Sequence, residues 1–265
     1  MKDISVIIPV HTYDETVAIC LETALNSVEE CRKHYTDGNI KVNFVGPHDV
    51  IKQLSDLYDL TDYAMITNDG KTDFCSQINY AVSQIDTDYF SILEFDDMYA
   101  PFWFKTVAEY YHTNEDVSLF LPINVVFEEG NNIRSFNNEM VWAGDFSKEI
   151  GVIDFDSLEN YYGFNLTGGV FNTSDFRKLG GFKPSIKVAF NHEHLLRLTH
   201  HKMKVYVIPK EGYKHRINRE NSLSDIYEKE LQKDEIKQWF DIAKSEYAYL
   251  KDREKKPVLV KEELK

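Results

Sequence analysis

The chain has 265 residues, and its 44 Asp and Glu outnumber its 30 Lys and Arg, for a formal net charge of -14. Its hydrophobic content of 43% and aromatic content of 14% suit a chain that buries a core, and they argue against global disorder. The acidic balance argues against a protein that grips a phosphate backbone by bulk charge. A bound polyphosphate would need another source of positive charge, and a divalent metal is the obvious one.

The ends of the chain and its cysteines favour a soluble, cytoplasmic protein. The opening run MKDISVIIPV is too short for the apolar region of a signal peptide. No stretch approaches the roughly 20 apolar residues of a membrane-spanning helix. Cys20, Cys31 and Cys75 are odd in number and widely spaced, which indicates reduced thiols rather than disulfides or a zinc site.

Apolar strands and amphipathic helices alternate over the first hundred residues. We predict strands at 5–10, 42–45, 63–67 and 89–93, and helices at about 17–28, 50–57 and 74–85. This alternation predicts an α/β fold with an open, mostly parallel sheet and flanking helices. Ligands bind such sheets at the carboxyl ends of the strands. That edge is expected to hold polar clusters at 9–13, 68–70 and 94–97.

The rest of the chain has a mixed pattern. It predicts strands at 118–127, 167–172 and 204–208, a hairpin or loop at 131–138, a helix at 192–201 and a long amphipathic helix at 226–250. Thr173 or Ser174 is expected to cap a short helix that ends at Gly180-Gly181. Because no clean linker appears, we predict a single domain over 1–265, divided at about residues 100 and 225 into two halves and a C-terminal helix with a tail.

Three carboxylates crowd the end of the fourth predicted strand, in Glu94-Phe95-Asp96-Asp97. Their mutual repulsion is costly unless a cation is present. The chain has no GxxxxGK[ST] loop whose lysine would hold a phosphate. Carboxylates that hold Mn²⁺ or Mg²⁺ against a diphosphate would do that work instead. The alternative is an ordinary solvated acidic loop.

Five segments in this order resemble the inverting family 2 glycosyltransferases of the GT-A fold. They cover roughly residues 4–225 and read SVIIPVHTYDE, YFSILEFDDMYAP, TGGVFNTSDFRKLGGF, NHEHLLRL and KHRINRENSLS. The resemblance implies a GT-A, Rossmann-like sheet with a nucleotide-sugar-binding half at about 1–100 and a small mixed acceptor half at 101–225. It implies an enzyme that moves a hexosyl or pentosyl unit from a nucleoside diphosphate sugar, with a UDP-sugar favoured, to an acceptor hydroxyl with inversion.

The resemblance also implies a donor site and a metal site. The metal would be held by Asp96 first, with Asp97 close behind and His215 as third ligand. His215 as a surface histidine is the alternative. Nucleotide-sugar contacts are expected from Pro9, Val10, His11, Tyr13, Asn68, Asp69, Gly70, Gln77, Asn79, Glu94, Phe95, Arg216 and Arg219. The two arginines could equally belong to a solvated basic patch.

Glu193 is the residue that we expect to act as general base, since inversion needs one carboxylate to take the acceptor proton. A helix ion pair with Arg197, four residues later, is the alternative. Asn191 stands where the family often has Asp, and His192 or His194 could replace the base or bind the acceptor. Trp142 and Gly169 are further acceptor-site predictions. The aromatic residues at 99 and 102–104 are expected in the core rather than in a sugar site.

Three departures from the family pattern concern the donor. Glu94 replaces the usual first Asp, the usual Asp-Asp-Gly-Ser after the second strand reads FVGPHD, and Ile78 replaces the usual Arg before Asn79. In this interpretation 68–70, Gln77 and Asn79 supply the missing nucleotide contacts.

Other functions stay open beside this one. A glycosyltransferase that modifies hydroxylated bases of phage DNA would use the basic cluster at 210–219, but the charge of -14 disfavours a DNA partner. A non-catalytic nucleotide- or carbohydrate-binding module on the same fold is the second alternative, and a nucleotidyltransferase is a weaker third. The expected partners are a nucleotide-sugar and a glycan, lipid-linked or other hydroxyl acceptor, with oligomer formation through the C-terminal helix left open.

Overall fold

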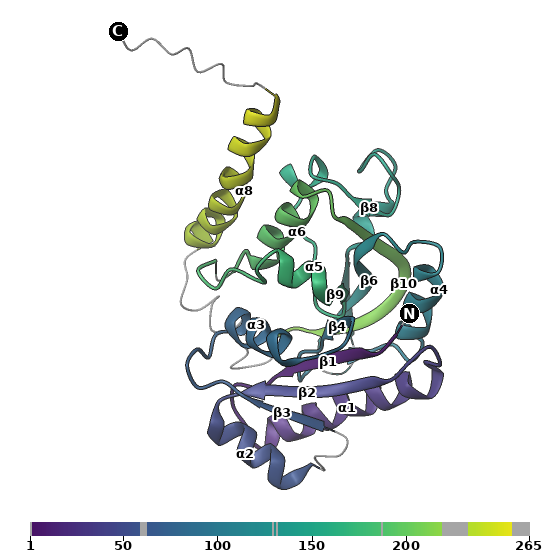
Figure 1. Cartoon of the computed structure of the whole chain (residues 1–265), viewed down its shortest axis with the longest axis vertical. Coiled ribbons are helices and arrows are strands. Elements are labelled where there is room, and N and C mark those ends of the chain that lie inside the picture. The colour runs from purple at the N-terminus through teal and green to yellow at the C-terminus, as the bar shows by residue number, and fades with distance from the viewer. Residues whose placement is uncertain are drawn as a thin grey trace.

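A single ten-stranded sheet runs through the computed structural model, which describes residues 2–58, 63–128, 130, 132–186, 188–218 and 233–255. Its strand order is β3-β2-β1-β4-β9-β6-β10-β5, with β7 paired to β6 and β8 paired to β10 (Figure 1). The strands are β1 (Ile4–Pro9), β2 (Ile40–Gly46), β3 (Tyr63–Thr67), β4 (Tyr89–Ile92), β5 (Met98–Tyr99), β6 (Val117–Glu128), β7 (Asn132–Asn137), β8 (Val152–Ile153), β9 (Val170–Asn172) and β10 (Lys204–Arg216). The helices are α1 (Glu15–His34), α2 (His48–Leu57), α3 (Phe74–Gln84), α4 (Trp103–Tyr111), α5 (Thr173–Lys178), α6 (Phe190–His200) and α8 (Lys233–Lys255), with short 3₁₀ turns η1 (Glu139–Trp142) and η2 (Ser157–Glu159).

The first half is the predicted parallel α/β unit. β1 pairs in parallel with β2 and with β4, and β2 pairs in parallel with β3. The carboxylates of Asp14 and Asp73 accept the backbone N–H groups of Val17 and Ser76, and so cap the first turns of α1 and α3. The predicted α/β class and its mostly parallel sheet are therefore confirmed.

The second half continues the same sheet with mixed pairing. β9 lies antiparallel to both β4 and β6, β10 runs parallel to β6, and β5 is antiparallel to β10. β10 is much longer than the predicted strand at 204–208, because it resumes after register shifts around Glu211. Pro209, which has no N–H to donate, interrupts the apolar pattern there and hides the continuation.

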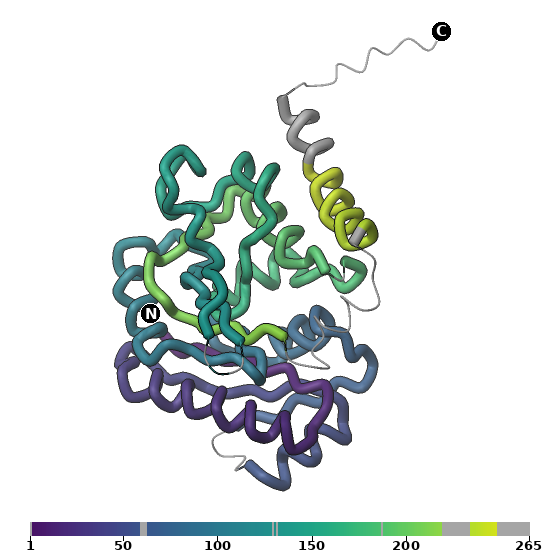
Figure 2. The backbone as a smooth tube through the Cα atoms, turned by 180° about the vertical axis from the view of Figure 1, so that it is seen from behind, coloured from purple at the N-terminus to yellow at the C-terminus, as the bar shows by residue number. Residues whose placement is uncertain are grey.

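Two apolar layers lie on the two faces of the sheet. α1, α2 and α4 pack against one face, and α3, α5 and α6 pack against the other, where α8 joins the apolar layer through α6 (Figure 2). β1 shows the alternation: Ile4, Val6 and Ile8 enter the first layer, while Ile7 enters the second. A central parallel strand covered on both faces explains why its sequence is a continuous apolar run.

The C-terminal helix α8 packs against α6 (Figure 1). Ala243 and Tyr247 are buried at this contact, and Lys183 forms an ion pair with Glu246 at 2.7 Å. The predicted helix at 226–250 thus corresponds to α8, and its first seven predicted residues lie outside the described part of the chain.

The structure also tests several local predictions. Asn172, rather than Thr173 or Ser174, caps α5 by accepting the N–H of Asp175, because β9 ends at this asparagine. Trp103, Phe104 and Tyr99 are core residues as expected, whereas Phe102 is 54% exposed. All three cysteines are buried, and none of them forms a disulfide. Among the described helices, none combines the length and apolarity needed to cross a bilayer.

Candidate functional site

The three polar clusters predicted at the carboxyl edge of the sheet do meet there. They follow β1, β3 and β4, which run in parallel within one sheet. The ring of His11, just beyond β1, has its centroid 5.7 Å from that of Phe95, which follows β4. The backbone N–H of Asn68 donates to the carbonyl of Gly46 at 2.9 Å, which ties the loop after β3 to the end of β2.

A tight turn after β4 presents the predicted carboxylates. The N–H of Asp97 donates to the carbonyl of Glu94 at 3.0 Å and closes this turn. The Asp97 carboxylate is buried, and both of its oxygens contact residues at the end of β10. Its Oδ1 accepts the N–H of Arg216 at 2.7 Å, and its Oδ2 lies 2.9 Å from Nδ1 of His215.

His215 carries positive charge in this arrangement. Burial alone would lower the pKa of its imidazole, but the carboxylate of Asp97, with further contributions from Glu94 and Asp96, raises the pKa to about 10. The imidazolium therefore donates from Nδ1 to Asp97. The positive charge balances part of the negative charge of the acidic cluster, and a metal ion bound by this imidazole would take the place of its proton.

One group of side chains among the described residues has the proximity that a metal site needs. Ligand atoms of Glu94, Asp97 and His215 all lie within 4.8 Å of one another. Carboxylate oxygens with one imidazole nitrogen form a donor set that Mn²⁺ accepts, so these residues fit the predicted cation. Two of the three predicted ligands are brought together, and Glu94, predicted to contact the nucleotide, joins them in place of Asp96.

Arg216 lies directly beside the carboxylate turn. Its Nε donates to the backbone carbonyl of Asp96 at 3.2 Å, and its guanidinium carbon stands 5.2 Å from the ring centroid of Phe127. These contacts hold the guanidinium at the edge where a diphosphate is expected. Arg219, the other predicted arginine, lies outside the described residues.

Two side chains, those of Asp69 and Gln77, hold the predicted nucleoside loop at 68–70 in place. The carboxylate of Asp69 accepts the N–H of His48 at 2.6 Å, at the start of α2. The buried amide of Gln77 donates to the carbonyls of Asn68 and Lys71, which fixes the loop around Gly70. The Gln77 carbonyl oxygen itself has no partner among the described residues. Both side chains therefore stabilise the conformation of this loop.

Four other residues predicted to contact the donor are buried or half-buried. Asn79 uses both ends of its amide on the backbone of Phe182, accepting its N–H and donating to its carbonyl at 2.8 Å each. Val10 is buried and donates its N–H to Val45. Pro9 is half-buried at the end of β1, and Tyr13 is half-buried against the first apolar layer.

The three predicted acceptor residues are not gathered at one point. Trp142 packs edge-on against Tyr206 and donates its indole N–H to Val207 at 3.2 Å, in the first part of β10. Gly169 is buried, and a Cβ there would come within 2.8 Å of Leu121. His192 is 2% exposed, and neither ring nitrogen has a hydrogen-bond partner among the described residues.

Glu193 is 0% exposed, and both of its carboxylate oxygens are occupied. Oε2 accepts from Arg197 at 2.9 Å, which is the helix ion pair weighed as an alternative. Oε1 accepts from the hydroxyl of Tyr247 at 2.7 Å and lies 3.1 Å from the ammonium of Lys183. No acceptor hydroxyl can reach this carboxylate while Tyr247 and Lys183 hold these positions.

Two tyrosines, Tyr213 and Tyr247, make contacts near these sites that the sequence did not predict. The hydroxyl of Tyr213 accepts the N–H of Glu94 at 3.0 Å. The only signal for it was its place two residues before His215, which puts both side chains on one face of a strand. Tyr247 was expected on the packing face of the C-terminal helix, but nothing in the sequence paired its hydroxyl with Glu193.

The mostly parallel sheet with flanking helices and a carboxylate turn after its fourth strand is typical of the GT-A class of protein. The family model described as "Glycosyl transferase family 2" matches residues 5–171, well over half of the chain, so the chain belongs to this family. The predicted family resemblance is thereby confirmed. A comparison with curated proteins found no match.

Solved structures show the same fold. The crystal structure of S. aureus TarS 1-349 is similar with a TM-score of 0.60 at 14% identity, covering 91% of this chain and 65% of that one. TarS 1-349 in complex with UDP has a TM-score of 0.59 at 14% identity, with the same coverage of 91% and 65%. TarS 1-349 in complex with UDP-GlcNAc has a TM-score of 0.59 at 14% identity, with 90% and 70% covered. The chain thus spans about 65% of the first of these structures.

Proposed function

We propose that this protein transfers a sugar from a nucleoside diphosphate sugar, with UDP as the nucleotide, to an acceptor hydroxyl with inversion. The observation that carries the proposal is the cluster of Glu94, Asp97 and His215, whose ligand atoms lie within 4.8 Å at the carboxyl edge of the sheet. Membership of glycosyl transferase family 2 supports the reaction class. The TarS complexes with UDP and UDP-GlcNAc support the choice of nucleotide.

In the proposed reaction the acceptor oxygen bonds to the anomeric carbon as the bond from that carbon to the diphosphate oxygen breaks. The diphosphate leaves with the electron pair, and the acceptor proton passes to a base. Glu94, Asp97 and His215 would hold Mn²⁺ or Mg²⁺, with Asp96 as a further proposed ligand, and the ion would supply positive charge that stabilises the leaving diphosphate. The guanidinium of Arg216, beside the same turn, is suited to bind a phosphate oxygen.

Glu193 remains our proposed base, with a condition that its surroundings impose. Tyr247 and Lys183 must move away from Oε1 before an acceptor hydroxyl can approach. Glu193→Gln is expected to keep UDP binding and to lower transfer by about 100-fold or more, the usual scale of general-base catalysis. Transfer at the wild-type rate in this variant would exclude Glu193 as base. Asn191→Ala and His192→Gln then test the two neighbours in the same assay.

The donor and the metal are tested together by thermal shift. UDP, GDP, CDP and dTDP sugars are added to the full chain with and without Mn²⁺, and we expect stabilisation by the UDP-sugar that requires the metal. Glu94→Ala is expected to abolish metal-dependent hydrolysis of the donor, because it removes one carboxylate of the cluster. Asp116→Ala, whose side chain is 71% exposed beside Lys204, is the matched control that should leave hydrolysis unchanged.

A nucleotide-binding protein without turnover is a second candidate function. The sealed carboxylate of Glu193 favours it, because a base that no acceptor can reach cannot take a proton. This candidate predicts that UDP stabilises the chain without Mn²⁺ and that no sugar is transferred or hydrolysed. Metal-dependent hydrolysis of UDP-sugar by the wild-type chain would exclude it.

A further inference from the structure

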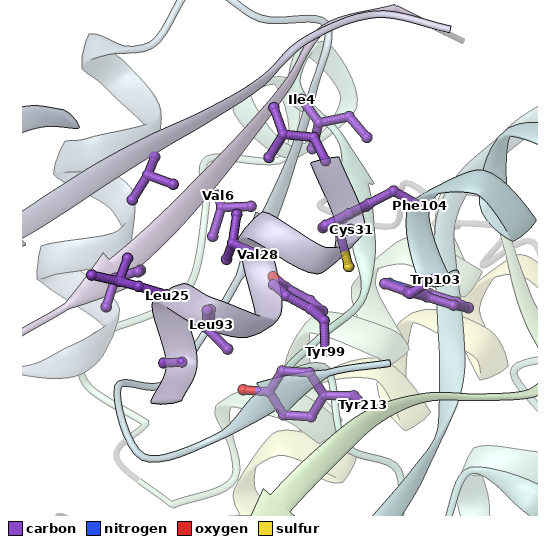
Figure 3. Packing of buried hydrophobic residues seen from close by; sticks show 14 of the residues in the cluster. Ile4, Val6, Leu25, Val28, Cys31, Leu93, Tyr99, Trp103, Phe104 and Tyr213 are labelled. Carbon is purple, nitrogen blue, oxygen red and sulfur yellow. The ribbon is translucent and has the colours of Figure 1, made fainter. Parts of the chain in front are cut away.

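Tyr213 stands at the centre of the packing behind the carboxylate turn. Its side chain is fully buried, and its ring lies edge-on to that of Tyr99 with the centroids 5.5 Å apart (Figure 3). The hydroxyl reaches the start of the turn and accepts the N–H of Glu94 at 3.0 Å. This is a buried polar contact between β10 and the first residue of the carboxylate cluster.

The ring of Tyr213 has no room to move away from this contact. Gly168, with φ of 76°, lies against it so closely that a Cβ would stand 2.4 Å from the ring atom Cδ2. The carbonyl of Gly168 accepts the indole N–H of Trp103 at 2.8 Å, and Gly212 leaves no space for a Cβ beside the same indole. The ring is therefore packed between Tyr99 of β5 and Gly168 in the turn before β9.

The contact ties together the groups that form the candidate cation site. Glu94 and His215 both belong to that site, and Tyr213 precedes His215 by two residues in the same strand. One stretch of β10 thus supplies the hydroxyl that holds the Glu94 backbone and the imidazole that contacts Asp97. The spacing between Glu94 and the other two ligands depends on this strand keeping its position.

We propose that Tyr213 is a positioning residue for the divalent cation. Its hydroxyl holds the Glu94 amide and thereby sets the distance of the Glu94 carboxylate from Asp97 and His215. The inference rests on the proposed function only in taking this cluster as the metal site. It does not depend on the identity of the sugar, the acceptor or the base.

The test compares Tyr213→Phe with the matched variant Tyr99→Phe in the full chain. Tyr99 is equally buried in the same aromatic group, but its hydroxyl bonds to Ser91 at 2.8 Å and not to the carboxylate turn. Mn²⁺ binding is measured by titration calorimetry and by the loss of the free-ion electron paramagnetic resonance signal. We expect Tyr213→Phe to weaken Mn²⁺ binding about five- to tenfold, the effect of one net hydrogen bond. Tyr99→Phe should leave it unchanged.

A double-variant cycle separates positioning from loss of packing. In a Glu94→Gln background, Tyr213→Phe should weaken Mn²⁺ binding no further, because the ligand that it positions is already altered. Additive effects in this cycle, or equal weakening by Tyr99→Phe, would overturn the inference. Circular dichroism and thermal melting without metal check that each variant is folded. Should Tyr213→Phe fail to fold, the absence of any Mn²⁺ weakening in Glu94→Gln alone would overturn it.

The outcomes for wild type distinguish this inference from the proposed function. Wild type that binds neither Mn²⁺ nor a UDP-sugar contradicts the proposed function, and the inference falls with it. Wild type that binds UDP-sugar with Mn²⁺, while Tyr213→Phe binds Mn²⁺ equally well, leaves the proposed function standing and refutes the role of Tyr213.

Discussion

Asp97 illustrates how one buried carboxylate serves both the fold and the candidate site. It accepts from the imidazolium of His215 and from the backbone of Arg216, which lie more than a hundred residues away in the chain. A buried charge without partners is expensive, so these two donors are what make its burial tolerable. The same contacts hold the end of β10 beside the turn after β4.

Removal of Asp97 should therefore destabilise the protein even without metal. We expect Asp97→Ala to lower the free energy of unfolding by about 3 kcal/mol, because the imidazolium and one N–H lose their acceptor. Urea denaturation at pH 7 measures the change. Asp116→Ala, at an exposed side chain, should change it by less than about 0.5 kcal/mol. A loss below about 1 kcal/mol in Asp97→Ala would contradict the structural role.

The helix α6 carries two histidines that are buried and neutral. Burial, with a smaller contribution from the charge of Lys244, lowers the pKa of His192 to about 4. Burial, with Arg197, lowers the pKa of His194 well below its usual value. These imidazoles stay neutral in the folded chain at pH values where an unfolded histidine takes up a proton.

The stability of the protein should consequently fall in mild acid. The contribution of His192 is complete above about pH 6.5, the pKa of an unfolded histidine, and is lost as the pH falls toward about 4. In this window each buried histidine steepens the decline by up to about 1.4 kcal/mol per pH unit. His192→Gln should flatten the curve from urea denaturation at several pH values, whereas the exposed His201→Gln should not. Equal slopes for the two variants would refute the assignment.

α8 is joined to α6 by the buried contact between Tyr247 and Glu193. We expect Tyr247→Phe to lower the free energy of unfolding by about 1 kcal/mol, since Glu193 keeps Arg197 and Lys183 as donors. Tyr80→Phe, the same change at a residue that is 40% exposed on α3, serves as control in urea denaturation. A change at Tyr247 no larger than that at Tyr80 would mean that the hydroxyl contributes nothing to the docking of α8.

The charge of -14, a property of the whole molecule, disfavours a nucleic-acid partner. We expect no measurable binding of double-stranded DNA by fluorescence anisotropy, even at low salt, because the acidic surface repels the phosphate backbone. DNA containing hydroxylated bases should behave like unmodified DNA. Binding that falls steeply with added salt would instead support the alternative of a DNA-modifying glycosyltransferase.

Most of the sheet could be predicted because its physical signals are local. β1 is covered on both faces and reads as an apolar run, and α1 and α3 show helical spacing after aspartate caps. The second part of β10 and the two-residue strand β5 were missed. The first follows Pro209 and a register shift, and the second is too short for any periodicity to be visible.

The candidate site divides in the same way. Glu94 and Asp97 were singled out from the sequence because polar clusters that follow parallel strands share one edge of the sheet, and His215 was singled out through the family resemblance of its segment. The sequence did not predict the contact of Glu193 with Tyr247 or the contact of Tyr213 with Glu94. Each joins residues 54 or 119 positions apart in the chain, and no local pattern encodes such a contact.

The sequence by itself determined the α/β class, the family and the place of the carboxylates, since these depend on periodicity, turn chemistry and short motifs along the chain. Only the tertiary structure decided which partners those carboxylates have. It bound Asp97 to His215 and Arg216, and it enclosed Glu193 beneath α8. The physical reason is that burial and hydrogen bonding depend on which distant segments pack together, and packing is a property of the folded sheet and its helices.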